Sequence, residues 1–457
     1  MSDSPTSISG TSGLPRDLGL PQATALAVTN MIGIGPFITI SLMLGTMGGP
    51  QALLGLALGA LLAFCDGLVW AELGTAMPKA GGTYNYLRTA YGANSWGRWL
   101  SFLVVWQVLF TAPLSVASGS IGFAKYLTYL LPGLAEGGVR LVAAAVPLVL
   151  TFLLYRRIRA VGTISLVLLA GVLAGCLWII GSGLPHVDPA KIFDFPADSF
   201  QVTKLSFWDG LGGATRYALY IYFGYYNVCF LAGEIRNPGR VVPRAMLWAI
   251  GAVAAIYFLL DAAVLSVIPW REAMESSYIA STYIERLYGS SAAKLMTVMI
   301  LWIAFSSVFS VLLGYTRFPF RAAEDDNFFT AFGRLHPKGG FPTVALVVMG
   351  LIASLFSLLD LREVIGSLIA SRVLLLFLPQ TIAFFVLRRK APEMKRPFRM
   401  WLYPVPGIIS IAGWLGVLAT SEPRSLIFAA GTFVVGSALY GYRSKTRGEW
   451  PFEKVPA

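Results

Sequence analysis

The chain has 457 residues, of which 56% are hydrophobic and only 13% are charged, and its mean hydropathy is +0.68. Soluble domains carry about 25% charged residues, so this composition excludes a set of soluble domains and indicates a protein that crosses the membrane several times. The net charge of +12 would suggest nucleic-acid binding in a soluble chain. Here it predicts orientation instead, because the lysines and arginines fall in short loops on one side of the membrane.

Residues 1–20 are polar and lack the apolar stretch of a signal peptide, so we expect a flexible cytoplasmic tail. About twelve apolar segments of roughly 18 residues or more come after it, and each predicts a transmembrane helix. The predicted spans are 21–47, 50–77, 95–131, 138–155, 160–182, 207–236, 242–268, 291–317, 342–358, 363–388, 402–420 and 424–442. We expect a core over 21–390 formed by helices 1 to 10, helices 11 and 12 within 391–443, and a second tail over 444–457. The lysines and arginines of the short loops place the N-terminus in the cytoplasm, and the even number of spans then places the C-terminus there too. We expect the protein in the plasma or inner membrane.

The first span is interrupted at its centre by Gly33-Ile34-Gly35-Pro36. Two glycines and a proline remove backbone hydrogen bonds where lipid cannot replace them, so the opened backbone must face protein or a water-filled cavity. The freed N–H groups after such a break suit a carboxylate, and the freed C=O groups before it suit an ammonium group or a metal cation. This combination fits an amino acid. The alternative is that the glycines only allow two helices to pack closely.

The sixth span, 207–236, contains Gly224 among several tyrosines near its middle. Taken alone, this glycine fits an ordinary aromatic helix as well as it fits a break. A second break five helices after the first is what an inverted repeat of five-plus-five helices produces, because an odd repeat reverses its direction through the membrane. We therefore predict an all-α polytopic membrane protein with broken helices 1 and 6.

Two longer motifs accompany the Gly-x-Gly break. One is the stretch from Ala71 to Leu87 (AELGTAMPKAGGTYNYL), and the other runs from Glu234 to Pro243 (EIRNPGRVVP). With these motifs the chain resembles the amino acid–polyamine–organocation superfamily, nearest its L-type amino acid transporter branch. The resemblance spans helices 1 to 10. It implies a twelve-helix inverted-repeat fold that works by alternating access.

The resemblance also implies which residues contact substrate. Backbone N–H groups around Ile34 and Gly35 would take the substrate carboxylate, and carbonyls around helix 6 would hold its amino group. Tyr220 would act as an aromatic gate over the bound substrate. The substrate contacts implied in this way are Asn30, Gly33, Ile34, Gly35, Tyr220, Ile221, Phe223 and Tyr226.

The sequence departs from the family pattern at positions that bear on substrate choice. Tyr226 stands where some relatives have a carboxylate, so a cationic substrate has no obvious counter-charge. Phe223 stands where many members have a smaller residue, which would shrink the side-chain pocket. Helix 5 lacks, beyond its basic entrance, the lysine that several proton-coupled relatives carry, so the coupling ion is left open.

Ionisable residues inside the spans are costly and each invites a functional hypothesis. Arg372 of helix 10 would meet Asp66 of helix 2 or a substrate carboxylate, or would form a structural ion pair facing the bundle interior. Asp66 is the first candidate for proton uptake, because burial disfavours the charged form of a carboxyl group. Glu72 is expected to pair with arginines near the cytoplasmic end of its helix, and Asp261 to cap or to reach the outer surface.

Sodium offers a second coupling hypothesis. Ser306 and Ser307 on helix 8 would line the place where sodium binds in related folds, with helix 1 carbonyls completing the site. Serines in membrane helices more often bond their own backbone, so we favour a co-transported proton over sodium.

Together these features predict a secondary active transporter of neutral, apolar amino acids. The alternative within the superfamily is a polyamine or a cationic amino acid, which the buried arginines disfavour. A channel would require charged or carbonyl rings from several subunits. An enzyme would require a catalytic cluster, and His186 and His336, in loops on opposite sides, form none. We expect no cofactor, no metal site and no nucleic-acid partner, and we find no transport residue to assign in helices 11 and 12.

Overall fold

The computed structural model of the chain describes residues 18–78, 82–155, 161–230, 232, 235–337 and 341–452. Several predictions lie outside these residues: most of the N-terminal tail, residues 79–81 of the helix 2 motif, the basic cluster at 156–160, Glu234 of the helix 6 motif and the last five residues. Within the described part the secondary structure is helical, apart from two isolated β-bridges that join Leu18 to Ile235 and Leu335 to Pro342.

Every predicted span corresponds to one helix, or to helical pieces that succeed one another with a short break. The first half of the chain forms α1 (Leu20–Met31), α2 (Gly35–Met47), α3 (Leu53–Ala76), α4 (Thr83–Tyr91), α5 (Trp96–Leu130), α6 (Glu136–Leu154), α7 (Val161–Gly183), α8 (Pro189–Ile192), α9 (Leu205–Tyr222) and α10 (Asn227–Phe230). The second half forms α11 (Pro238–Val267), α12 (Trp270–Glu275), α13 (Ile279–Tyr288), α14 (Ser290–Tyr315), α15 (Arg317–Glu324), α16 (Thr343–Phe356), α17 (Leu361–Arg372), α18 (Leu378–Lys390), α19 (Val405–Ala419) and α20 (Pro423–Arg447). Short 3₁₀ turns cover Pro50–Ala52, Leu184–His186 and Thr330–Gly333, and a π-helical turn over Val373–Phe377 joins α17 to α18.

The lengths and composition of these helices confirm an all-α polytopic membrane protein. Among the described residues, seven helices are long and apolar enough to cross a membrane, and the bent pair of α1 and α2 makes an eighth. Three shorter apolar helices, Ala170–His186, Thr343–Phe356 and Val405–Ala419, occupy further predicted spans. The final helix, α20, continues through Arg447, beyond the predicted end of its span at 442.

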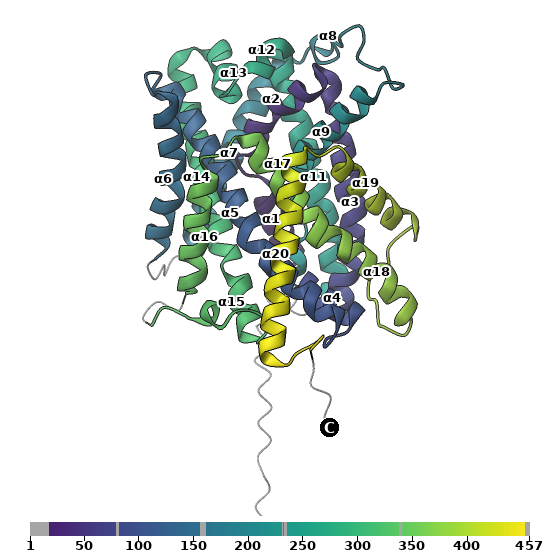
Figure 1. The fold of residues 1–457 in the computed structure, drawn as a ribbon. Helices are drawn as coiled ribbons and strands as arrows, with labels where there is room; N and C mark the ends of the chain where they lie inside the picture. The colour runs from purple at the N-terminus through teal and green to yellow at the C-terminus, as the bar shows by residue number, and fades with distance from the viewer. Residues whose placement is uncertain are drawn as a thin grey trace, which may run out of the picture.

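The loops separate to opposite ends of the molecule (Figure 1). The short helices α8, α12 and α13 lie at one end, and α4 and α15 lie at the other. The first group belongs to loops predicted to face outward and the second to loops predicted to face the cytoplasm. The observed arrangement therefore agrees with the predicted alternation of spans.

Both predicted breaks are present, and they pack on each other. α1 and α2 are bent by 51° at the residues between Met31 and Gly35. In helix 6, α9 ends at Tyr222 and α10 begins at Asn227. Gly224 in that gap has φ +122°, which disfavours any residue with a side chain, and a Cβ there would lie 2.5 Å from the Asn30 carbonyl oxygen. The second glycine is therefore no incidental residue of a continuous helix.

Small residues bring α3 and α9 together beside the breaks. A Cβ at Gly55 would lie 2.5 Å from the Cβ of Ala214, and one at Gly59 would lie 2.7 Å from the Cβ of Ala218. Glycines spaced four apart allow membrane helices to approach at backbone distance, where van der Waals contact holds them. This packing fixes the position of the helix 6 break along the axis of α3.

Candidate functional site

The break in helix 1 presents unused backbone donors. Among the described residues, the N–H groups of Gly33, Ile34 and Gly35 donate no hydrogen bond, whereas the N–H of Ile32 donates to the Val28 carbonyl at 2.9 Å. These groups lie at the start of α2, where the helix dipole adds partial positive charge. Buried backbone donors are almost always paired, so three free ones at one place indicate a position for an anionic group.

The break in helix 6 presents unused acceptors. Within the described part of the chain, the carbonyls of Tyr220, Tyr222 and Phe223 accept no hydrogen bond, while the next helical piece begins with a bond from Asn227 N–H to the Gly224 carbonyl at 3.0 Å. Carbonyls opened in this way suit a positively charged donor. The two breaks, held together at Gly224 and Asn30, thus offer complementary polar groups to the two poles of an amino acid.

A residue that the sequence reasoning missed, Tyr257 of α11, ties the two breaks together. Its hydroxyl lies 2.9 Å from the Met31 carbonyl oxygen and 3.1 Å from the Ile221 carbonyl oxygen, and the side chain is 1% exposed. One O–H donor is therefore shared between the last turn before each break. The only signal in the sequence was a tyrosine within an apolar span, where a buried hydroxyl needs a partner.

Tyr220 lies against the start of α2, and its role as an aromatic gate stays a prediction. A Cβ at Gly35 would lie 2.8 Å from Ile221 Cγ2 and 3.3 Å from Tyr220 Cε1, so only glycine allows this close approach. The Tyr220 hydroxyl is hydrogen-bonded to Ser118 Oγ of α5 at 2.8 Å. Ile34 is buried and packs against Gly119 and Gly122 of the same helix.

The remaining polar candidates of the first break lie around α1 and α14. The Asn30 side chain is exposed at the end of α1. Ser307 of α14 lies against the break, since a Cβ at Gly33 would be 2.6 Å from its Oγ, and Ser306 is buried next to it. The serines are therefore beside helix 1, where the sodium hypothesis requires them, and their role stays a prediction.

Aromatic side chains enclose the helix 6 break. Phe223 lies 5.1 Å from Phe377 between ring centroids, and Tyr226 stacks on Trp70 at 4.9 Å. Phe377 in turn stacks on Trp414 of α19 at 4.4 Å. α19, which corresponds to the eleventh predicted span, therefore contributes Trp414 to the aromatic side chains around the helix 6 break. The sequence did not indicate this contact.

Asp66 and Arg372 do not form the predicted ion pair. Asp66 is fully buried and accepts hydrogen bonds from the Tyr225 hydroxyl at 2.7 Å and from Trp414 Nε1 at 3.2 Å. Arg372 is 5% exposed and donates to the Tyr226 hydroxyl at 3.0 Å. Among the described residues, neither has a group of opposite charge within 4.0 Å, so the prediction of an Asp66–Arg372 pair is wrong.

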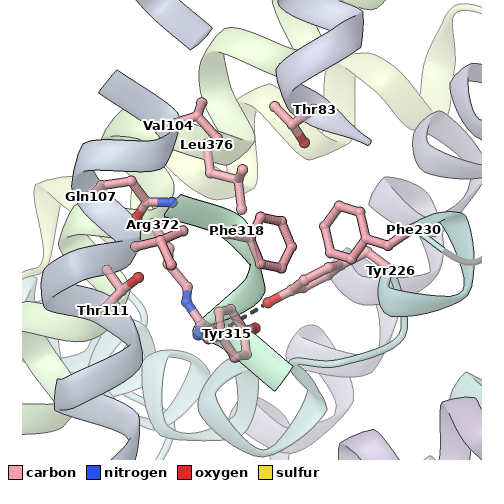
Figure 2. Close-up of a pocket in the computed structure, with 11 residues that line it drawn as sticks. Thr83, Val104, Gln107, Thr111, Tyr226, Phe230, Tyr315, Phe318, Arg372 and Leu376 are labelled. Carbon is pink, nitrogen blue, oxygen red and sulfur yellow. Dashed lines mark hydrogen bonds between the residues drawn. The ribbon is translucent and has the colours of Figure 1, made fainter. Parts of the chain in front are cut away.

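Small cavities flank the breaks on both sides. One of about 20 Å³ lies beside Tyr226 and Arg372 (Figure 2). Another of about 10 Å³ is lined by Pro36, Phe37 and Asp261. Each has room for about one water molecule. Asp261 is 5% exposed and faces this second cavity, so it neither caps a helix nor reaches the outer surface as predicted.

Several known proteins are similar to this chain over most of its length. Residues 18–437 match the family described as "Amino acid permease". The serine/threonine exchanger SteT of Bacillus subtilis (strain 168) is 28% identical over 93% of this chain and 95% of its own length. The branched-chain amino acid permease BcaP of the same organism is 23% identical over 88% and 87% of the two chains. The large neutral amino acids transporter small subunit 2 of Homo sapiens is 27% identical over 92% and 79%.

Proposed function

The chain belongs to the amino acid permease family of the amino acid–polyamine–organocation superfamily, and we propose that it moves a neutral, apolar amino acid across the membrane by alternating access. Its family and relatives are transporters, so a membrane-embedded enzyme is set aside. The protein acts in amino acid transport as a multi-pass membrane protein.

One observation carries the proposed site: among the described residues, the unpaired N–H groups of the helix 1 break lie beside the unpaired C=O groups of the helix 6 break. The N–H groups of Gly33, Ile34 and Gly35 would bind the substrate carboxylate. The carbonyls of Tyr220 and Phe223 would bind its ammonium group. This division of roles leaves the substrate side chain to the surrounding aromatic residues.

A neutral and apolar side chain fits those surroundings best. Phe223 and Tyr226 present ring surfaces, and Tyr220 covers the break. The three relatives are named for serine and threonine, for branched-chain amino acids and for large neutral amino acids. A polyamine or cationic amino acid would approach Arg372, whose charge would repel it.

Proton coupling through Asp66 is the finer part of the proposal. This carboxyl group is buried between helix 2 and the helix 6 break, and its partners in the described part of the chain are neutral donors. A buried carboxyl group without a cation can take up a proton at modest cost. Because Tyr225, which contacts it, lies in the break itself, protonation would be linked to movement of helix 6.

We also propose the cellular arrangement. The core over 21–390 would carry transport, with residues 391–443 packed against it and both termini in the cytoplasm of the plasma or inner membrane. The basic loops at one end of the molecule support this orientation.

The test is thermal stabilisation of the full-length, detergent-purified protein by each common amino acid and polyamine, because a ligand that binds only the folded state raises the melting temperature. We expect stabilisation by leucine, phenylalanine or a similar amino acid. It should be lost in Gly35→Trp and Tyr220→Ala. Matched controls are Gly251→Trp, where a Cβ meets no atom within 4 Å, and Tyr442→Ala, whose side chain is 73% exposed.

The same thermal-stabilisation experiment includes the result that would contradict the proposal. Stabilisation by arginine or polyamines alone would overturn the neutral substrate. Repeating the titration at two pH values, with and without sodium, tests coupling: a response to pH that is absent in Asp66→Asn supports the proton, and a response to sodium that is absent in Ser307→Ala supports the serine site instead.

A further inference from the structure

Three arginines in the described part of the chain are buried, each 5% exposed: Arg216, Arg372 and Arg443. Arg216 donates to the Thr420 carbonyl at 2.9 Å and lies 3.9 Å from Glu422. Arg443 pairs with Glu449 at 2.8 Å. Arg372 alone of the three has no carboxylate within 4.0 Å among the described residues. A buried charge without a counter-ion is strongly unfavourable. Among the described residues, Arg372 therefore lacks the carboxylate partner that Arg216 and Arg443 have.

The partners that Arg372 does have are neutral. It donates to the Tyr226 hydroxyl at 3.0 Å, to Ser115 Oγ at 3.3 Å and to the Tyr315 hydroxyl at 3.4 Å. Its Cζ also lies 5.2 Å from the ring centroid of Phe223. Hydroxyl oxygens and ring faces solvate the cation but supply no net negative charge. Because the Tyr226 and Tyr315 hydroxyls also interact with each other, one of their two hydrogens stays available to a further acceptor.

The guanidinium borders a cavity whose other polar groups also lack partners. The cavity of about 20 Å³ is lined by Gln107 and Thr111 of α5, each 1% exposed, beside Arg372 and Tyr226. Among the described residues, Gln107 Oε1 and Thr111 Oγ1 have no hydrogen-bond partner. Figure 2 shows the Gln107 amide nitrogen directed into this space, and the apolar Val104 and Leu376 on its wall. The orphaned Gln107 Oε1 is an acceptor, so the groups that can donate into this space are the Arg372 guanidinium, the Thr111 hydroxyl and the Gln107 amide nitrogen, and the space holds one small ion or molecule.

The cavity is connected to the substrate site by polar residues on one face of α5. Gln107, Thr111, Ser115 and Ser118 succeed each other at intervals of four, four and three residues, which places them on one side of a helix. Ser115 contacts Arg372, and Ser118 contacts the Tyr220 hydroxyl beside the helix 1 break. Tyr226 belongs to the helix 6 break and to the cavity wall. An ion bound in the cavity would therefore lie among residues that also contact the helix 1 and helix 6 breaks.

We infer that this cavity, with Arg372 at its centre and Gln107 and Thr111 as further donors, binds a small singly charged anion. The chemistry is shared by two sources: a free halide such as chloride, and a carboxylate on the side chain of the transported amino acid. The size of the cavity favours a monatomic ion. The inference goes beyond the proposed function for a halide. For a side-chain carboxylate it rests only on the proposed broken-helix transport site, and it would replace the neutral substrate of that proposal by an acidic one.

The experiment uses the full-length protein in detergent, with chloride titrated against gluconate at constant ionic strength. We expect the melting temperature to rise with chloride and to saturate. The rise should be absent in Arg372→Gln and retained in Arg216→Gln, which removes the other buried arginine of the membrane region. Should Arg372→Gln not fold, Gln107→Leu and Thr111→Val remove donors while keeping the charge, and each should raise the chloride midpoint about tenfold.

A parallel titration with aspartate and glutamate, in gluconate, distinguishes the second source. Stabilisation by these amino acids that Arg372→Gln abolishes and Arg216→Gln retains would assign the site to a substrate carboxylate. No response of the wild-type protein to either anion, or equal responses in the Arg372 and Arg216 variants, would overturn the inference. Leucine in the same plates reports the proposed substrate site separately, so failure of one conclusion is not mistaken for failure of the other.

Discussion

Asp66 and Glu72 lie six residues apart on α3 and are equally buried, with 0% and 1% of their surface exposed, but their hydrogen-bond partners differ in charge. Glu72, near the end of the helix, pairs with Arg388 at 2.6 Å and with Arg396 at 3.3 Å, which confirms the predicted pairing. Asp66, at the level of the breaks, has only neutral donors among the described residues.

The same difference separates two regions of the molecule. At the end of the molecule that holds α4 and α15, which we call the rim, charges neutralise one another within the fold: Glu72 with its two arginines, Glu449 with Arg98 and Arg443, and Asp326 with Arg443 and Arg447. Around the breaks, Asp66 and Arg372 have no group of opposite charge within 4.0 Å among the described residues. Charges paired by the fold stabilise it, whereas charges left over are available to ligands and protons. The comparison predicts that rim variants lose stability and keep binding, whereas variants at the breaks weaken substrate binding or transport.

The largest effect is expected at the rim, for Glu72→Ala. Removing this carboxylate leaves Arg396, whose side chain is 5% exposed, without its acidic partner, and also frees the Met400 N–H that donates to it at 2.7 Å. The free energy of unfolding should fall by about 3 to 5 kcal/mol. Denaturant titration measures the loss, and the stabilisation by substrate should be unchanged. A variant of wild-type stability would contradict the structural role of the rim.

Next in size is Gly224→Ala in the helix 6 break. The residue has φ +122°, and the added Cβ would lie 2.5 Å from the Asn30 carbonyl oxygen, so the two breaks must separate. Strain of about 1 to 3 kcal/mol should lower uptake into proteoliposomes by about tenfold to a hundredfold. The control is Gly251→Ala, where nothing lies within 4 Å of the added atom. Equal uptake by both variants would show that the contact between the breaks is dispensable.

A smaller effect is expected for Tyr257→Phe, which removes the hydroxyl shared by the Met31 and Ile221 carbonyls. Loss of this bond should cost about 1 kcal/mol or somewhat more and weaken substrate binding about tenfold. Tyr283→Phe is the matched control, because its buried hydroxyl bonds the Ile179 carbonyl of α7 and, among the described residues, none of the carbonyls at the two breaks. If both variants bind substrate equally well, Tyr257 does not position the breaks.

The smallest effect concerns pH at the rim. A hydrogen bond from Arg447, together with the charges of nearby arginines, lowers the pKa of Asp326 below its ordinary value. A carboxyl group with a lowered pKa in the folded state stabilises above its unfolded pKa of about 4, and this contribution is lost as pH falls through the folded pKa. The melting-temperature difference between wild type and Asp326→Asn should be constant from neutral pH to about pH 5 and vanish in stronger acid. The pair is exposed, so less than about 1 kcal/mol is expected.

This last measurement sharpens the comparison. Because the lowered pKa of Asp326 keeps it ionised near neutral pH, a change of substrate binding there does not come from Asp326, and Asp66→Asn then tests the group at the breaks. A pH dependence near neutral that Asp326→Asn removes would contradict the division into rim and breaks.

The sequence alone was sufficient for features with local causes. An apolar run long enough to cross a bilayer becomes a helix wherever it packs, so the predicted spans could be located from composition. Gly33, Gly35 and Pro36 interrupt the helix through their own backbone chemistry. The break at Gly224 could be predicted only together with the break in helix 1, and its positive φ is a finding of the structure. The pairing of Glu72 could be predicted from its place at a helix end among arginines.

Only the tertiary structure decided which distant side chains meet. Tyr257, Ser118 and Trp414 reach the breaks from α11, α5 and α19, and no local pattern records how those helices are rotated about their axes. The same rotation sends Arg372 toward Tyr226 instead of Asp66, and turns Asp261 toward a cavity instead of the surface. A rotation of one helix by a single residue, about 100°, changes every partner that it has. Helix positions are therefore set by local hydropathy and backbone chemistry, whereas the partners of each charge are set by packing across the whole bundle.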